Sequence, residues 1–235
     1  MMKFEKQIVK EIICSKPRTI VKPREFFIAW SGVPTLAYQG FTPTLLDIKK
    51  ELEQKIPGIK PENPGSKWPK TTIGALRDDE KLSLDDLCLL RKICDKFNTE
   101  INKKNFVFNI DQLQVVVFQC RAIEKRLATY QIDLNPNEFD DNDPPERHIE
   151  DVNETMKQFS DSRLKEYWSD VSRPGNRESH YRMPHIESTL IYDLPDSKDQ
   201  PSYIEDFIKE VNKKFPDLYC WFAPESRHMT VRALS

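Results

Sequence analysis

The sequence lacks any apolar run of the ~20 residues that a membrane-spanning helix requires. Its N-terminus, MMKFEKQIVKEIICSK, carries charges throughout and lacks the apolar core of a secretory signal. The five cysteines are an odd number without the spacing of a disulfide framework, which favours reduced thiols. These absences predict an intracellular, cytoplasmic protein with no membrane association.

A strong charge of one sign is also missing. The net charge is −2, which gives no overall attraction to nucleic acid or to anionic membranes, so any anion site must be local. The sequence contains no Walker loop, no G-x-G-x-x-G and no H-E-x-x-H, and we expect neither a cofactor nor a metal site. A hydrophobic content of 38% with 31% charged residues is typical of a globular chain.

Alternation and helical periodicity predict a mixture of helices and strands. Helices are expected over residues 4–13, 43–55, 83–98, 148–168 and 202–214, with Ser83 and Ser202 as N-caps and a further helical turn at 122–129. Strands are expected over residues 25–30, 71–76, 106–121, 188–194, 219–222 and 228–234.

An acidic, turn-rich stretch at 135–147 is predicted to be a mobile surface connection. It divides the chain into four expected parts. These are an N-terminal extension (1–24), a first lobe (25–132), an insertion with a helix and a polar loop (133–185), and a second lobe (186–235). The insertion is a possible surface for a protein partner.

The two expected lobes share one pattern. In each, a strand precedes a helix that stops at a proline, Pro57 or Pro216. Thirteen residues beyond Pro57 begins KTTIGAL, and twelve residues beyond Pro216 begins HMTVRAL. This match predicts an α+β fold with mainly antiparallel sheets, built as a bilobal, pseudo-two-fold duplication of a β-helix-β unit.

Alternation along the two matching strands indicates which side chains project together. His228, Thr230 and Arg232 should share one face of the second strand, and Lys70 and Thr72 the matching face of the first. Hydroxyls, a guanidinium and an imidazole suit a phosphate-like anion and can move a proton near neutral pH. The alternative is an exposed polar face of an ordinary antiparallel sheet.

The stretch WFAPESRHMTVRAL, which contains His228 and Thr230, resembles a histidine motif of the 2H phosphoesterase superfamily, the LigT-like and cyclic-phosphodiesterase-like enzymes. The likeness covers roughly 25–132 and 186–235. It implies two lobes that each contribute an H-x-T/S strand to a central groove. It also implies two histidines that act as acid and base on a phosphodiester, often a 2′,3′-cyclic phosphate, and hydroxyls that hold the phosphate without a metal.

This sequence departs from that pattern in the first motif, where Lys70 replaces the histidine and Thr72 is retained. A lysine of ordinary pKa is too basic to act as a base at neutral pH, but it could hold phosphate, or act as an acid if burial lowered its pKa. His180, Tyr181 and Arg182 lie in a polar loop (172–184) that would supply ligand contacts if it folded over the groove. Otherwise it is a solvated loop. Two tryptophans, one from each matching loop, complete the expected ligand site: Trp68 and Trp221.

These residues predict a metal-independent phosphodiesterase acting on a cyclic nucleotide or an RNA end, with His228 as general acid or base. Two alternatives stay open. One is a nucleotide- or RNA-end-binding module that has lost catalysis, and the other is a protein-interaction adaptor in which apolar side chains fill the groove.

Overall fold

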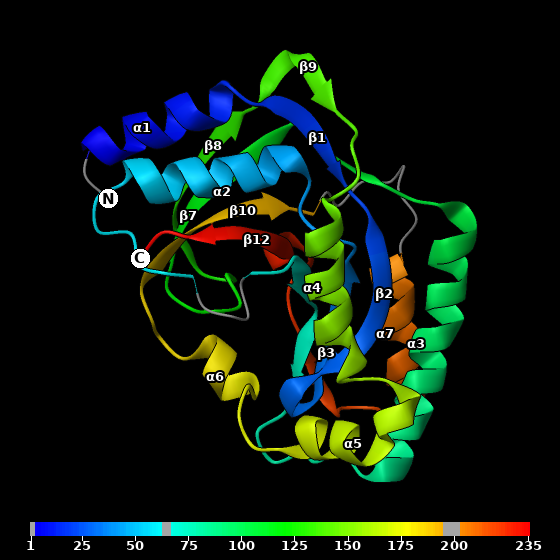
Figure 1. Ribbon diagram of the computed structural model, residues 1–235. Helices are drawn as coiled ribbons and strands as arrows, with labels where there is room; N and C mark the ends of the chain where they lie inside the picture. The colour runs from blue at the N-terminus through cyan, green and yellow to red at the C-terminus, as the bar shows by residue number, and fades with distance from the viewer. Residues whose placement is uncertain (1–2, 63–66, 195–202) are drawn as a thin grey trace.

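The structure is a computed structural model that describes residues 3–62, 67–194 and 203–235. Over these residues the chain is a mixed α/β protein with seven α-helices and mainly antiparallel, open sheets (Figure 1). The helices are α1 (Lys3–Cys14), α2 (Pro43–Lys55), α3 (Leu84–Lys104), α4 (Glu146–Lys157), α5 (Leu164–Ser172), α6 (Glu178–Arg182) and α7 (Tyr203–Lys214). Among the described helices, none is both long enough and apolar enough to cross a membrane.

The first sheet is built around one strand that is interrupted at a single residue. The segments β4 (Lys70–Thr72) and β5 (Gly74–Leu76) flank Ile73. β4 pairs with β3 (Val33–Tyr38), which pairs with β2 (Pro23–Ala29), and all these pairs are antiparallel. β5 pairs antiparallel with β11 (Tyr219–Trp221) in a two-stranded sheet of its own, which the chain joins to the β2-β3-β4 sheet through Ile73, and the two are together called the first sheet.

The second sheet has the order β12-β10-β7-β8 and is wholly antiparallel. Its strands are β7 (Gln112–Phe118), β8 (Arg126–Asp133), β10 (Glu187–Asp193) and β12 (His228–Ala233). The third sheet, β6-β1-β9, consists of β1 (Pro17–Val21), β6 (Phe108–Ile110) and β9 (Asn135–Asp140). Its β1–β9 pair is parallel.

Local sequence explains where the main helices begin. Pro43 occupies the first turn of α2, where its missing N–H removes no intrahelical bond. Ser83 caps α3, because its hydroxyl accepts from the Asp86 amide and the Asp86 carboxylate accepts from the Ser83 amide. The expected helices at 43–55 and 83–98 are therefore confirmed, and α3 continues two turns further, to Lys104.

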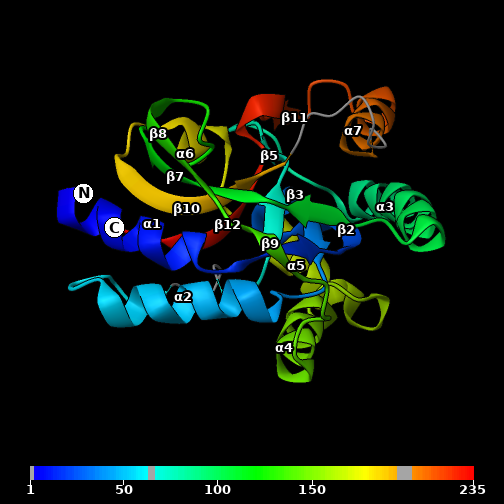
Figure 2. The ribbon, with the colours of Figure 1, turned by 90° about the horizontal axis from the view of Figure 1, so that it is seen from above.

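The helices cover the sheets on different sides. α1 and α2 lie against one face of the β12-β10-β7-β8 sheet, and α6 lies on the other (Figure 2). α3 packs on β2 and beside α7, where the rings of Phe26 and Phe207 stack with centroids 4.6 Å apart. Met229, Val231 and Leu190 belong to the main buried core, whereas Ala233, which alternation would place on the same apolar face as Met229 and Val231, is only partly buried and lines a cavity.

Several expectations from the sequence are wrong. Residues 126–133 form strand β8 where the sequence predicted a helical turn at 122–129. The predicted connection at 135–147 begins with strand β9, which pairs with β1. The single helix expected at 148–168 is two helices, α4 and α5, and the loop at 172–184 contains α6. The expected N-cap Ser202 lies outside the described residues.

The sheets also cross the lobe boundaries that the sequence suggested. β7 and β8 come from the expected first lobe, yet they pair with β10 in the sheet of the second. β11 comes from the expected second lobe and pairs with β5 in the sheet of the first. The two halves of the sequence are therefore interlocked.

Candidate functional site

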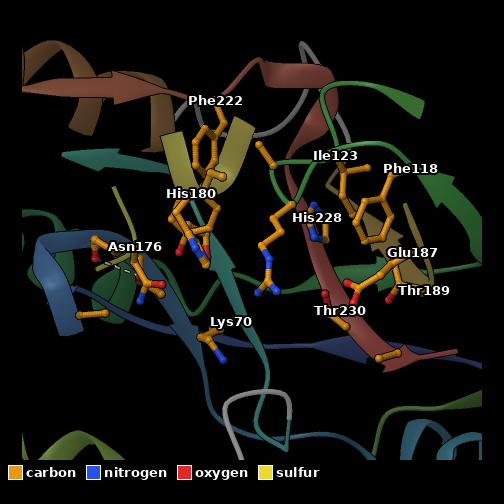
Figure 3. Close-up of a pocket in the computed structure, with 18 of the residues that line it drawn as sticks. Lys70, Phe118, Ile123, Asn176, His180, Glu187, Thr189, Phe222, His228 and Thr230 are labelled. Carbon is orange, nitrogen blue, oxygen red and sulfur yellow. Dashed lines mark hydrogen bonds between the residues drawn. The ribbon is translucent and has the colours of Figure 1, made fainter. Parts of the chain in front are cut away.

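The strands β4 and β12 contact each other, and a cavity of about 390 Å³ lies where they meet. Lys70 and Thr72 line it from β4, and His228 and Thr230 line it from β12 (Figure 3). The four residues singled out from the two matching strands therefore share one cavity. Its volume is within the range of small-molecule sites.

Aromatic and cationic side chains make up much of the remaining wall. The aromatic members are Trp30, Trp68, Phe118, Tyr181 and Phe222, and the further cationic or titratable members are Arg121 and His180. One carboxylate, Glu187, belongs to the lining, and its Oε1 lies 2.7 Å from His185 Nε2. Aromatic rings beside cations suit a ligand that combines a flat ring with a negative charge.

His228 is oriented by its own turn. Its Nδ1 lies 2.7 Å from the carbonyl oxygen of Ser226, and this contact requires Nδ1 to carry the proton in the neutral ring. Nε2 is then left with a lone pair. Burial is the main cause that lowers the pKa of His228 below its usual 6.5, and Arg126 adds to it, whereas the Ser226 carbonyl and Asp193 oppose it. His228 is therefore neutral at pH 7 and can accept a proton.

Lys70 differs from an ordinary surface lysine. Its Nζ lies 4.4 Å from the centre of the Trp68 ring. Burial lowers its pKa to about 8, with a further contribution from the nearby charge of Lys49 and an opposing one from Glu62. At pH 7 the amine is mostly protonated, but it holds its proton loosely enough to donate it.

The threonines add neutral hydrogen-bonding groups to the site. Thr230 lines the cavity on the His228 side. Thr72 lines it on the Lys70 side, as does the neighbouring Tyr181. Burial raises the pKa of Tyr181 to about 12, so this phenol stays protonated and can donate.

Hydrogen bonds hold α6 against the turns that follow β5 and β7, and α6 carries His180 and Tyr181 to the cavity. The Ser179 amide donates to Asp78 at 3.0 Å, and the Ala122 amide donates to the Tyr181 carbonyl at 3.0 Å. Burial, followed by the charge of Arg121, lowers the pKa of His180. In the structure, the 172–184 loop therefore folds over the groove, which is one of the two arrangements considered for it from the sequence.

Arg232 does not lie in the cavity, contrary to the expected alternation. Leu190 is opposite Arg232 but Ile191 is opposite Thr230, so Val231 is an extra residue in β12. This β-bulge turns Arg232 to the face of Leu190, away from Thr230, and Ala233 lines the cavity instead. The Arg232 side chain is buried and donates to the Lys60 carbonyl at 2.6 Å.

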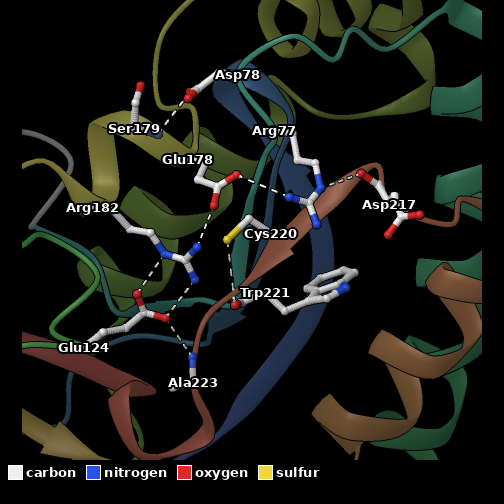
Figure 4. Close-up of polar contacts among 10 residues, drawn as sticks. All are labelled: Arg77, Asp78, Glu124, Glu178, Ser179, Arg182, Asp217, Cys220, Trp221 and Ala223. Carbon is white, nitrogen blue, oxygen red and sulfur yellow. Dashed lines mark hydrogen bonds and ion pairs between the residues drawn. The ribbon is translucent and has the colours of Figure 1, made fainter.

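Arg182 and Trp221 also lie outside the cavity lining. Arg182 is held by two carboxylates, Glu124 at 2.9 Å and Glu178 at 2.5 Å (Figure 4). The Trp221 ring N–H donates to Asn212 at 2.8 Å on α7. Both side chains support neighbouring elements, and neither is placed to contact a ligand in the cavity.

Sequence reasoning missed the guanidinium that does line the cavity, Arg121, which follows β7. It also missed Glu187 and Thr189, which project from β10 beside β12. Thr189 lies on the strand predicted over 188–194 and Glu187 immediately precedes it, so their two-residue spacing was an available signal. Arg121 was the last residue of the strand predicted over 106–121, but β7 ends at Phe118, so alternation could not place its side chain.

Within the described residues, no three His, Cys, Asp or Glu side chains are grouped so that they could hold a metal ion. The chain matches no family model, no curated protein and no solved structure. The geometry of the cavity is therefore the basis for assigning a function.

Proposed function

We propose that this chain is a phosphodiesterase of the 2H phosphoesterase type, in which Lys70 takes the place of one of the two histidines. One observation carries the proposal: a neutral histidine and a lysine of lowered pKa line the same cavity, each followed by a threonine two residues on. The substrate class that fits best is a nucleotide or RNA end with a cyclic phosphate, because aromatic rings and cations line the same space.

An internal duplication is part of this proposal. The strands that carry K-T-T and H-M-T contact each other, and each contributes its first and third residues to the cavity. Each belongs to a mainly antiparallel sheet. A pseudo-two-fold relation between 25–76 and 188–234 would explain why two sequence-distant strands supply equivalent groups.

The two proton carriers have complementary states at neutral pH. His228 Nε2 would accept a proton from water as the water oxygen attacks phosphorus. Lys70 would donate its proton to the ribose oxygen as the bond from that oxygen to phosphorus breaks. The product is a phosphomonoester, and exchange with solvent returns His228 to its neutral form and Lys70 to its charged form.

The other groups in the cavity would bind the phosphate and stabilise its charge. Thr72 and Thr230 would donate hydrogen bonds to the non-bridging oxygens. Arg121 supplies a permanent positive charge in the same wall. This electrostatic contribution matters because negative charge builds up on these oxygens in the transition state.

The direct test is hydrolysis of 2′,3′-cyclic nucleotides, 3′,5′-cyclic nucleotides and RNA fragments with cyclic ends, in the presence of EDTA. We expect turnover of at least one of the three. His228→Asn should lower kcat/KM by about 10²–10⁴-fold, the usual contribution of a general acid or base. Thr230→Val should weaken binding by about 1–3 kcal/mol through the lost hydrogen bond.

His148→Asn is the matched control, because His148 belongs to α4 and does not line the cavity. Its activity should equal that of the unchanged protein. Loss of activity in both histidine variants, or in neither, would argue against the assignment of His228.

A binding module without catalysis is the second candidate. The replacement of the first histidine by Lys70 favours it, because it leaves only one of the two imidazoles that the reaction normally uses, whereas a lysine and a threonine can still hold an anion. In that case the unchanged protein binds nucleotides in a salt-sensitive manner without turnover, and Lys70→His creates cyclic phosphodiesterase activity. If both proteins are inert and neither binds nucleotides, the phosphate site itself is wrong.

A further inference from the structure

Three poorly exposed charged side chains form a group outside the cavity lining, and two of them act on Lys70 through their charge. Lys49 of α2 forms an ion pair with Glu62 at 2.9 Å, and only 11% and 14% of these side chains are exposed. Arg232 of β12 is 2% exposed. None of the three lines the cavity. Buried charges cost free energy unless they are paired and hydrogen-bonded, so these three side chains differ from charged residues on an exposed surface.

Both cations are attached to the stretch that follows α2. Arg232 Nη2 donates to the carbonyl of Lys60 at 2.6 Å, and the Lys49 ammonium binds the carboxylate of Glu62 at 2.9 Å. Lys60 and Glu62 precede Trp68 and Lys70 by eight positions each. The two contacts therefore fix the chain shortly before it supplies the ring and the amine of the site.

The charges of this group also act on one another. Lys49 repels Lys70, and Glu62 attracts it. Arg232 in turn repels Lys49. The opposite charges of Lys49 and Glu62 largely cancel in their effect on Lys70. Removal of either partner leaves one uncompensated charge in a poorly solvated place, where its effect on the pKa of Lys70 is large.

We propose that Lys49, Glu62 and Arg232 are positioning residues for Lys70. Arg232 and Lys49 hold the stretch Gly58–Glu62 against β12 and α2, and the Lys49–Glu62 pair sets the electrostatic balance at the amine. The inference rests on the proposed function for the role of Lys70 as proton donor, whereas its test requires no enzymatic activity.

Other charged groups also face Lys70, and they must be kept constant in the test. From the cavity side these are Arg121 after β7, His180 of α6, Glu187 of β10 and His228 of β12, with the phenol of Tyr181. All five stay unchanged in the variants, so any shift reports the buried pair alone.

The test measures how readily Lys70 is acetylated as a function of pH, with trace acetic anhydride and mass spectrometry. Only the neutral amine reacts, so the midpoint gives the pKa of Lys70, which lies at about 8 in the unchanged protein. Lys49→Gln should raise this midpoint and Glu62→Gln should lower it, each by more than about half a pH unit. The double variant, which has neither charge, should return close to the starting value.

Lys213→Gln is the control for general charge effects, because Lys213 is 70% exposed on α7. It should leave the midpoint unchanged. Shifts of opposite sign support the proposal, because damage to the fold would move both single variants in the same direction. Shifts of the same sign, or none, overturn it.

Arg232 is tested by amide hydrogen exchange over residues 57–62. Arg232→Met should speed amide exchange there at least about tenfold. Arg232→Lys keeps the positive charge but lacks the several N–H donors of the guanidinium, so its exchange rate should lie between those of the unchanged protein and Arg232→Met. Unchanged exchange in Arg232→Met would remove Arg232 from the proposal.

The outcomes separate this inference from the proposed function. If the Lys70 midpoint shifts in opposite directions in the two single variants but the protein hydrolyses no phosphodiester, the positioning role of Lys49 and Glu62 is supported and the proposed enzyme activity is rejected. If the protein hydrolyses a phosphodiester but the Lys70 midpoint is the same in all variants, the enzyme activity is supported and the positioning role is rejected.

Discussion

At the scale of single residues, the pKa of His228 lies below neutral pH and the pKa of Lys70 lies above it. Burial lowers the pKa of both, His228 from 6.5 and Lys70 from 10.5 to about 8. Because burial destabilises the charged form of each group, the histidine is unprotonated at pH 7 and can accept a proton, whereas the lysine is still protonated and can donate one. The same physical cause thus gives two different roles.

This pairing predicts a bell-shaped dependence of kcat/KM on pH. The rising limb should have a midpoint below 6.5, where His228 loses its proton, and the falling limb a midpoint near 8, where Lys70 loses its own. In Lys70→His the falling limb should move to lower pH, because an imidazole is a stronger acid than an ammonium. Activity that is flat from pH 6 to pH 10 would contradict both assignments.

The burial of Lys70 also has a consequence for stability. Its pKa is lower in the folded chain than in the unfolded one, so the folded state pays for holding the charge at every pH below about 8. We therefore expect Lys70→Met to abolish turnover and yet raise the free energy of unfolding by about 1–2 kcal/mol at pH 7.

The sign of this effect can be checked by urea unfolding at several pH values. Between about 8 and 10.5 the unfolded chain holds more protons than the folded one, so the unchanged protein gains stability as pH rises. The advantage of Lys70→Met should shrink over that interval. Lys67→Met, at an exposed neighbouring position, should show neither effect.

Alternation placed four of the five strand residues in one cavity, as the structure has them, and failed at the fifth. His228 and Thr230 precede the extra residue Val231, so their faces follow the simple rule, whereas Arg232 comes after it. A β-bulge depends on pairing with β10, and the sequence of one strand does not contain that information. The sequence therefore suggested a guanidinium in the cavity but not the one that is there, Arg121.

At the scale of elements, composition misled where a polar segment is held by tertiary contacts. The stretch NPNEFDDNDPPER has the composition of a connecting loop, yet its first six residues form β9 beside β1. Phe139 is 50% exposed, which is why no alternating apolar pattern marks this strand. In contrast, α2 begins at a proline and α3 at a capping box, each has an apolar face within its own sequence, and both were predicted well.

Asp140, at the end of β9, caps a helix that is distant in sequence. Its carboxylate accepts from the Thr44 amide at 3.1 Å and the Thr44 hydroxyl at 2.7 Å, in the first turn of α2. The N-cap residue of α2, Thr42, makes no side-chain cap of its own. Burial pushes the pKa of Asp140 upward, but the hydrogen bonds from Thr44 and Asn142 outweigh it and hold the pKa below its usual value.

We expect Asp140→Ala to lower the free energy of unfolding by about 1–3 kcal/mol, because it leaves the first turn of α2 without its partner. Asp141→Ala, at the adjacent exposed position, should change it by less than about 0.5 kcal/mol. Urea unfolding near neutral pH measures both. Equal effects of the two variants would mean that β9 does not cap α2.

At the scale of the whole molecule, the cavity exists because strands from distant parts of the chain interlock. β11 is added to β5 in the first sheet, and β7 is added to β10 in the second. The sequence predicted most of these strands but not their partners, because pairing between distant segments leaves no local pattern. The expected lobes 25–132 and 186–235 are therefore not separate structural units.

Gly74 provides a test of how tightly the sheets are coupled. It is paired with Trp221, and a Cβ at this position would lie 2.7 Å from the carbonyl oxygen of Cys220, which is backbone and cannot easily move. Gly74→Ala should therefore push β11 away from β5 and destabilise the protein by about 1–3 kcal/mol.

If the interlocked strands fold as one unit, that loss must appear in both sheets. Native-state amide hydrogen exchange should show the same decrease in protection for β3, which lies in the first sheet, and for β7 and β10, which lie in the second. Thr129→Ala, on the exposed face of the edge strand β8, should leave both sheets protected. A decrease confined to β3 and β4 would mean that the two sheets unfold independently.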